Sequence, residues 1–286
     1  MPRVNKAIEL LEQGQPIYYT GIREVSFEAG VEAAQTWADY INVEMEHGIF
    51  DISALDAFMR GLVEGGPTKS GHRTPAVIIT LPTNGSSENV IRANAWMFGQ
   101  ALNRGIHGIL LCHAEDPKAI KAFVESVRYP FHTIGVGEGL DDGRRGNGGQ
   151  GSAAPIWGIS VQEYMERADV WPLNPKGEIL LGLKIENKRA LANAEENAKV
   201  PGIAFAEWGP GDMGMSLGYV GERDNEKMLV VRKRVFDACK SAGIAFLNGV
   251  RPDNVKEIID EGVMIGSGSE EAADIGRKYT KRSIPW

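Results

Sequence analysis

Short apolar runs alternate with amphipathic helical patterns along almost the whole chain. Between most of the runs, apolar residues recur at steps of three and four, which is the pattern of a helix that buries one face. Eight such units predict a (β/α)8 TIM barrel, whose chemistry is expected where the strands lead into the following loops. The strand candidates are residues 16–21, 40–45, 76–81, 108–112, 133–137, 179–185, 202–206 and 243–247.

A doubly wound α/β sheet is the alternative architecture. It is less favoured because the first strand-to-helix turn, TGIREVS, contains no glycine-rich phosphate-binding loop. We therefore expect one α/β barrel domain over residues 1–286. Two segments depart from the repeating pattern. Residues 138–154, dense in glycine and charge, predict a long mobile loop, and residues 252–286 predict a C-terminal helical extension.

Charge and hydropathy argue against two classes of partner. The net charge of −7 and the isoelectric point near 5.4 do not suit a nucleic-acid-binding protein, which needs a basic face. No stretch approaches the roughly 18 apolar residues of a membrane span, and the N-terminal helix pattern has no apolar signal core. We expect a cytoplasmic protein. Cys112 and Cys239 are too isolated to predict a disulfide framework or a zinc site.

Two apolar runs near the middle of the chain lead directly into acidic residues. Glu186 follows ILLGLKI, and Asp212 follows IAFAEWGPG. Carboxylates delivered at the same ends of neighbouring parallel strands predict a site for a hard divalent cation such as Mg²⁺ or Mn²⁺. Taken singly, Glu186 could be an acid at a helix N-terminus and Asp212 a turn residue. Together they favour the metal site.

A histidine and two acids follow the second strand candidate. Glu44, Glu46 and His47 come directly after the apolar run, and Asp51 is placed to cap the next helix. At the mouth of a barrel, a nearby carboxylate can fix the tautomer of His47 and raise its basicity, so His47 is the candidate base. His113, after the fourth strand candidate, is a second histidine at the mouth. The alternative for either is a structural hydrogen bond.

Several motifs in this order resemble the HpcH/HpaI aldolase family of metal-dependent class II 2-oxo acid aldolases. They are EMEHGIFD, LKIEN, AEWGPGDMGMSLGY, the RYP after the fourth helix pattern, and RRG followed by AAPIWG. The resemblance implies a TIM barrel in which Glu186 and Asp212 hold Mg²⁺, Mn²⁺ or Co²⁺. It implies that His47 handles the proton, with Glu44 placed to orient it. Backbone amides of Gly211 and Asp212 would hold the substrate carboxylate.

The same resemblance implies an enzyme, a carbon–carbon lyase. It would cleave a 4-hydroxy-2-oxo acid into pyruvate or a related 2-oxo acid and an aldehyde. Arg145 in the RRG stretch and Trp208 in the AEWGPGD loop are further candidates for substrate binding. Family members are commonly homohexamers, trimers of dimers, with exchanged C-terminal helices. An aromatic or bulky aldehyde is conceivable, although aromatic residues in barrels more often belong to the core. The aromatic candidates are Tyr18, Phe50, Trp157, Trp171, Trp208 and Tyr219.

Four positions depart from the family pattern: Glu44 and Asn103 stand where the family carries an aspartate and an acid, and two further changes bear on the chemistry. Thr80 or Leu81 stands where the family usually carries an arginine at the end of strand three, and Lys184 replaces a glutamine two residues before Glu186. We hypothesise that the Lys184 amine supplies the positive charge of the missing arginine. Its alternative role is Schiff-base chemistry with a carbonyl substrate. Two other functions stay open: a CoA-thioester lyase of related barrel type, and a repurposed barrel with an altered reaction.

Overall fold

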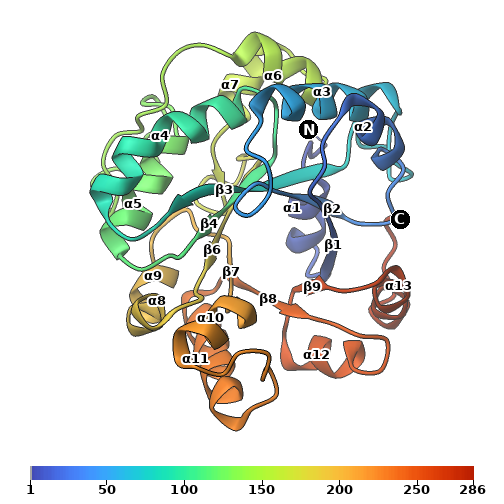
Figure 1. The fold of residues 1–286 in the computed structure, drawn as a ribbon. Coiled ribbons are helices and arrows are strands. Elements are labelled where there is room, and N and C mark those ends of the chain that lie inside the picture. The colour runs from blue at the N-terminus through green and yellow to red at the C-terminus, as the bar shows by residue number, and fades with distance from the viewer. Residues whose placement is uncertain (1) are drawn as a thin grey trace.

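The computed structural model describes residues 2–286 as a closed barrel of parallel strands surrounded by helices (Figure 1). Eight strands run around the barrel in the order β4-β3-β2-β1-β9-β8-β7-β6, and β4 pairs with β6 to close it. This confirms the (β/α)8 TIM barrel. The strands are β1 Ile17–Ile22, β2 Tyr40–Glu44, β3 Ala76–Asn84, β4 Gly108–Cys112, β5 Val170–Trp171, β6 Ile179–Lys184, β7 Phe205–Glu207, β8 Ala245–Gly249 and β9 Ile265–Ser267.

The helices begin where the sequence places capping side chains. The Asp51 carboxylate accepts hydrogen bonds from the backbone N–H groups of Ser53 and Ala54, as expected from its position. The helices are α1 Lys6–Glu12, α2 Phe27–Ala33, α3 Ile52–Glu64, α4 Glu88–Leu102, α5 Pro117–Val127, α6 Gln150–Trp157, α7 Val161–Arg167, α8 Lys188–Ala192, α9 Ala194–Ala198, α10 Pro210–Leu217, α11 Glu226–Ala242, α12 Val255–Glu261 and α13 Glu270–Tyr279.

One strand candidate is wrong, and a different segment completes the barrel. Residues 133–137 form turns, because Gly135 and Gly137 both take left-handed backbone conformations with φ of 82° and 79°. The eighth barrel strand is instead β9, in which Ile265 pairs with Ile17 on one side and with Leu247 on the other. The two-residue strand β5 only adds to the start of β6.

The first helix covers the end of the barrel at which the strands begin. Ala7, Ile8 and Leu10 of α1 pack against apolar residues that include Ile17 and Tyr40, the first residues of β1 and β2. This apolar cluster fills the barrel interior at that end. The opposite end, where the strands lead into their loops, is therefore the end available for a site, as in other barrels of this architecture.

A buried carboxylate connects the two ends of the chain to the barrel. Asp39, just before β2, has Oδ1 2.7 Å from an Arg282 nitrogen, 3.3 Å from an Arg277 nitrogen and 3.4 Å from Lys6 Nζ. Lys6 belongs to α1 and Arg277 to α13, so one charge network holds both terminal helices.

Residues 252–286 form the helices α12 and α13, but they are not a helical extension outside the barrel, because the barrel strand β9 lies between them. Val255 of α12 and Ala272 of α13 are buried in one cluster with Tyr18 of β1.

The glycine-rich segment is shorter than the loop predicted over residues 138–154, because α6 begins at Gln150. Its backbone is attached to the preceding helix, since the N–H groups of Arg144 and Arg145 donate to the carbonyls of Glu125 and Arg128. Gly143 sits against this backbone, where a Cβ atom would lie 2.4 Å from the Arg128 carbonyl oxygen.

Among residues 2–286, none of the helices combines the length and apolar character needed to cross a membrane.

Candidate active site

The strands deliver a cluster of polar side chains at the end of the barrel where their carboxyl ends meet. Glu46 follows β2, His113 follows β4 and Glu186 follows β6. One ligand atom from each of these three residues lies within 4.8 Å of the others. Asp212, in the first turn of α10 after β7, faces the same pocket as Glu186. The prediction that Glu186 and Asp212 would meet at one site therefore agrees with their placement.

The Glu186 carboxylate is largely buried, and only one of its oxygens accepts a hydrogen bond from the described chain. Its residue is 1% exposed, and Oε1 accepts a hydrogen bond of 2.9 Å from the backbone N–H of His113. Within the described part of the chain, no hydrogen bond reaches Oε2, whose nearest cation is Lys184 Nζ at 3.8 Å. Burial raises the pKa of Glu186, and the Lys184 charge only partly opposes this.

Gly209 makes room for the Glu186 side chain. A Cβ atom at Gly209 would lie 2.4 Å from Glu186 Cβ and 2.7 Å from its Oε2. Gly209 also takes a left-handed conformation, with φ of 48°, just before α10. The GPGD turn thus needs glycine at this position for two reasons, and it sets the distance between Glu186 and the helix that carries Asp212.

Lys184 is an ammonium group enclosed by acids. Its Nζ lies 2.5 Å from Glu46 Oε2, and its side chain is 13% exposed. Burial alone would lower the pKa of Lys184, but the acidic groups around it, including Glu186 and Glu207, raise it overall. A lysine that keeps its proton is a poor nucleophile, so this geometry does not favour the Schiff-base alternative.

The third strand carries no cation into the site. Thr80 and Leu81 are both buried in β3, and Thr80 Oγ1 has no hydrogen-bond partner among residues 2–286. The positive charge in the cluster comes instead from the Lys184 ammonium at the end of β6. This placement is consistent with the hypothesis that Lys184 replaces the family's arginine.

The cluster holds more negative than positive charge. Glu46, Glu186, Glu207 and Asp212 lie around the single ammonium of Lys184. Burial, together with the neighbouring acids, raises the pKa of Glu207 to about 7 despite the opposing effect of Lys184. An environment that resists another negative charge is one in which a divalent cation is electrostatically favourable. The oxygen-rich donor set of Glu186 and Asp212 fits such an ion.

The pocket at this site has a volume of about 430 Å³ and a mainly polar lining. Met215 is the only apolar side chain among its lining residues, which are Asn84, Ser86, His113, Glu115, Glu186, Asn187, Arg189, Asp212, Met215 and Ser216. The charge of Arg189 is met by Glu115, 2.6 Å away. This pocket is therefore suited to a small ligand with several hydrogen-bonding groups.

His47 is at the mouth of the barrel, but Glu44 does not orient its ring. The imidazole is 64% exposed, and its Nε2 lies 3.8 Å from Glu46 Oε2. The Glu44 carboxylate instead accepts a 2.7 Å hydrogen bond from the backbone N–H of His47. Glu46, not Glu44, is the carboxylate beside the imidazole, and it also lies 3.7 Å from His113. Glu44 therefore shapes the loop, which corrects its expected role.

The other predicted substrate-binding residues divide between the site and the core. Gly211 is exposed in the first turn of α10 beside Asp212, where helix N–H groups lack intrahelical partners and can hold a carboxylate. Trp208 is buried and donates its indole N–H to Asn248 at 3.2 Å. Neither residue is counted among the pocket-lining side chains.

Arg145 lies in a separate environment. Its guanidinium carbon is 4.4 Å from the centre of the Tyr129 ring, and a nitrogen donates to the Tyr164 hydroxyl at 2.8 Å. The side chain is buried among these aromatic rings, and it does not line the pocket that contains Glu186. In this structure Arg145 holds the glycine-rich segment against the helices, and the substrate-binding role predicted for it has no geometric support.

Sequence reasoning underrated three members of the cluster. Glu46 and His113 are visible in the sequence as polar residues after strands, but their proximity to Glu186 depends on the pairing of β2, β3, β4 and β6. Glu207 gave a weaker signal, since it is an acid inside the short apolar run of β7.

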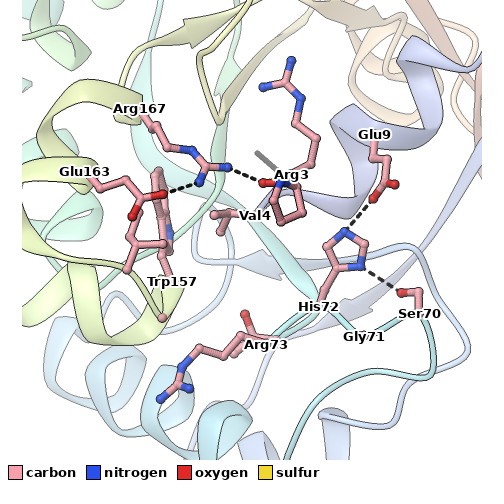
Figure 2. A pocket seen from close by; sticks show the side chains of 14 residues that line it. Arg3, Val4, Glu9, Ser70, Gly71, His72, Arg73, Trp157, Glu163 and Arg167 are labelled. Atoms are coloured by element: carbon pink, nitrogen blue, oxygen red, sulfur yellow. Dashed lines mark hydrogen bonds and ion pairs between the residues drawn. The ribbon is translucent and has the colours of Figure 1, made fainter.

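A second pocket, of about 340 Å³, lies between the N-terminal segment and the loop before β3 (Figure 2). Here Ser70 Oγ lies 3.0 Å from His72 Nδ1, and His72 Nε2 lies 2.9 Å from Glu9 (Figure 2). The Arg167 guanidinium is paired with Glu163 at 2.8 Å and with Glu178 at 2.6 Å. Of the residues predicted for the site, only the aromatic candidate Trp157 lines this pocket, and the predicted catalytic and metal-binding residues lie elsewhere.

The chain is similar to known proteins in sequence and in fold. The sequence matches the family described as HpcH/HpaI aldolase/citrate lyase over residues 31–271. A hydroxypyruvate/pyruvate aldolase of Paraburkholderia phytofirmans is 24% identical over 235 residues, which are 82% of this chain and 79% of the relative.

Solved structures share the fold. A HpcH/HpaI aldolase/citrate lyase family protein of Burkholderia cenocepacia has a TM-score of 0.73 at 20% identity, with 97% of both chains covered. The citrate lyase β subunit of M. tuberculosis, complexed with oxaloacetate and magnesium, has a TM-score of 0.54 at 14% identity. That comparison covers 94% of this chain and 98% of the other.

Proposed function

Since this chain belongs to the HpcH/HpaI aldolase/citrate lyase family, we propose that it is a metal-dependent aldolase. It cleaves a 4-hydroxy-2-oxo acid into pyruvate, or a related 2-oxo acid, and an aldehyde. The observation that carries the proposal is the convergence of Glu186 and Asp212 on one polar pocket, beside an excess of negative charge. The hydroxypyruvate/pyruvate aldolase named among the relatives supports this reaction class.

A divalent cation held by Glu186 and Asp212 would act as a Lewis acid for the enolate that carbon–carbon cleavage produces. The chain's own groups bind and orient the substrate around that position. The first-turn N–H groups of α10, at Gly211 and Asp212, bind the 2-oxo acid carboxylate. The Lys184 ammonium adds positive charge close to Glu186.

Two imidazoles are available to move the proton of the 4-hydroxyl group. His47 is exposed at the mouth and lies 3.8 Å from Glu46, whereas His113 lines the pocket itself. Proton transfer requires the base to reach the substrate hydroxyl, and His47 shares the Glu46 carboxylate with the pocket-lining His113. We assign the base role to His47, with Glu46 as its neighbouring carboxylate.

The aldehyde product is proposed to be small and polar. Asn84, Ser86, Asn187 and Ser216 line the pocket and offer hydrogen bonds to hydroxyl groups. None of the six aromatic residues considered from the sequence lines it, and Trp157 instead donates its indole N–H to the Gly105 carbonyl. The lining therefore favours a hydroxylated aliphatic aldehyde over an aromatic one.

A CoA-thioester lyase is the less supported alternative. Such an enzyme would need basic groups near the pocket for the nucleotide phosphates, yet Arg189 at the rim is paired with Glu115.

We also propose a homohexamer built as a trimer of dimers; exchange of the C-terminal helices in it would require α13 to leave the Asp39 network that holds it on its own barrel. Ile49 and Trp96 are 79% and 55% exposed, and Trp96 packs edge-on against Phe50 with the ring centres 6.0 Å apart. Exposed apolar side chains of this kind are consistent with subunit contacts. Light scattering after size exclusion measures the assembly.

The proposed reaction is tested by release of pyruvate from a panel of 4-hydroxy-2-oxo acids, read through lactate dehydrogenase. Metal-stripped protein is assayed with and without Mg²⁺, Mn²⁺ or Co²⁺, alongside Glu186→Gln and Asp212→Asn. The exposed Glu257→Gln on α12 is the matched control. Metal-dependent release that both site variants abolish supports the aldolase. Metal binding without release from any substrate would point to an altered reaction.

A further inference from the structure

We propose that His113 is a third protein ligand of the divalent cation, and that its imidazole makes the site prefer a transition-metal ion such as Co²⁺ to Mg²⁺. This rests on the proposed metal dependence and adds a nitrogen donor to Glu186 and Asp212. Carboxylates and water suit Mg²⁺, whereas imidazole nitrogen suits later transition metals. A nitrogen in the coordination shell would therefore set the choice of metal.

The first observation is the spacing of the donor atoms. His113 Nδ1 lies 3.4 Å from Glu186 Oε1. Two donors that are each about 2.1 Å from one ion, at coordination angles of about 90° to 110°, are about 3.0 to 3.5 Å apart. The pair is already at the separation that shared coordination requires. His113 and Glu186 also line the pocket that contains Asp212.

The second observation is the tautomer that the surroundings select. The Asn187 amide group lies 3.3 Å from His113 Nδ1, and its Nδ2 also donates to Glu115 at 2.8 Å. Because Asn187 Oδ1 accepts the N–H groups that begin α8, the amide nitrogen faces the imidazole. Nδ1 is therefore unprotonated, and a metal ion would take over the single electron pair that now accepts the long 3.3 Å contact from Asn187.

The opposite ring nitrogen then carries the proton. His113 Nε2 faces Glu46 Oε1 at 3.7 Å. A carboxylate beyond the far nitrogen of a metal-bound histidine is a common arrangement, because it fixes the ring and raises its basicity. Glu46 is held in place by its 2.5 Å contact with Lys184. Glu46 thus helps to fix the orientation of the His113 ring from the side opposite the proposed ion.

The third observation is the backbone of His113. It takes a left-handed conformation, with φ of 44°, and only Lys281 is another non-glycine residue with positive φ within residues 2–286. This conformation is costly for most side chains and is concentrated at functional sites. It is maintained by the His113 N–H bond to Glu186 and by the bond from the Ala114 N–H to the Lys184 carbonyl. Both contacts direct the ring to the carboxylate cluster.

The Glu186 carboxylate also leaves room for an ion. Glu186 is 1% exposed, and no hydrogen bond within residues 2–286 reaches its Oε2. Carboxylates that are largely withdrawn from water are normally hydrogen-bonded or bound to a cation. An ion beside His113 Nδ1 would bring a cation to this carboxylate, whose Oε1 is the oxygen 3.4 Å from the imidazole.

The test measures nitrogen coordination directly, in protein loaded with Mn²⁺. Electron spin-echo modulation detects the ¹⁴N nucleus of a coordinated imidazole. The variant is His113→Asn, because asparagine tolerates positive φ and carries no imidazole. His47→Asn, at the other histidine near Glu46, is the matched control, and circular dichroism verifies the fold of both.

We expect the ¹⁴N modulation in the wild type and in His47→Asn, and its loss in His113→Asn. Competition binding gives the second readout. The preference for Co²⁺ over Mg²⁺ should fall at least about 10-fold in His113→Asn, since loss of outer-shell partners alone costs roughly 10- to 100-fold in affinity.

Two results separate the inference from the proposed function. If Mn²⁺ binds and is lost in Glu186→Gln, but His113→Asn keeps the modulation and the Co²⁺ preference, then His113 is not a ligand and the metal-dependent function stands. If no divalent ion binds the wild type, both the ligand assignment and the metal-dependent function are overturned.

Discussion

Replacing Lys184 with glutamine is expected to destabilise the metal-free protein by about 3 to 5 kcal/mol. Lys184 Nζ lies 2.5 Å from Glu46 Oε2 and 3.8 Å from Glu186 Oε2, in a largely buried position. Glutamine has a similar shape but no charge. The substitution therefore leaves two buried carboxylates beside each other, and beside Glu207, without the cation that now separates them.

The magnitude follows from the distances. At the 3.8 Å separation from Glu186, with an effective dielectric constant near 20, one ion pair is worth about 4 kcal/mol. Removing one partner of a buried pair typically costs about 3 to 5 kcal/mol, because the other charge stays buried. The two contacts of Lys184 share these costs and are not additive.

The assay is urea unfolding followed by tryptophan fluorescence at pH 7.5 in the presence of a chelator. Lys188→Gln, an exposed lysine at the start of α8, is the control and should leave the free energy of unfolding nearly unchanged. The same substitution at Lys184 should tighten divalent-cation binding, because a competing positive charge is removed. A metal-free Lys184→Gln protein within about 1 kcal/mol of the wild type, with weaker metal binding, would refute the reasoning.

Three further outcomes are expected. Burial raises the pKa of Glu207 to about 7, so the fold favours its neutral form. The preference for neutral Glu207 contributes about 3 kcal/mol to the free energy of unfolding below about pH 4.5. That contribution is lost as the pH rises to 7. Glu207→Gln should remove that slope from urea unfolding of metal-free protein, whereas a parallel pH profile would contradict it. Gly209→Ala should weaken metal binding measured by calorimetry, because the new methyl group meets Glu186; unchanged affinity would mean that the turn relaxes. Asp39→Asn should lower the free energy of unfolding by about 3 to 5 kcal/mol, since buried arginines lose their anion; a cost below 1 kcal/mol would argue against the network.

The barrel could be predicted from the sequence because its signals are local. Periodicity predicted helices between most of the strands, and most strand candidates lie within a few residues of the observed strands. The segment at residues 133–137 misled because its apolar residues alternate with glycines, which adopt turns instead of extending. The short β9 was obscured between two helices, since three residues carry almost no periodic signal.

The site was predicted as a pair of carboxylates and a histidine, but not as a cluster. Glu186 and Asp212 can be recognised in the sequence because they follow apolar strand runs. The role of Glu46 instead depends on which strands are neighbours in the barrel. The contact between Glu46 and Lys184 joins residues 138 positions apart, and no local pattern encodes it. The expected roles of Glu44 and Arg145 came from motif position, and side-chain direction decided against them.

Closure of the barrel by β1 and β9 has a consequence for biosynthesis. Ile17 of β1 pairs with Ile265 of β9, so one edge of β1 has no partner until a segment about 250 residues later has been synthesised. At ribosomal rates of about 5 to 20 residues per second, that edge stays unpaired for roughly 12 to 50 s during translation. The apolar face of α1 is close to β1 and can shield it only in part. Nascent chains of this protein are therefore expected to need a chaperone until the last strand has left the ribosome.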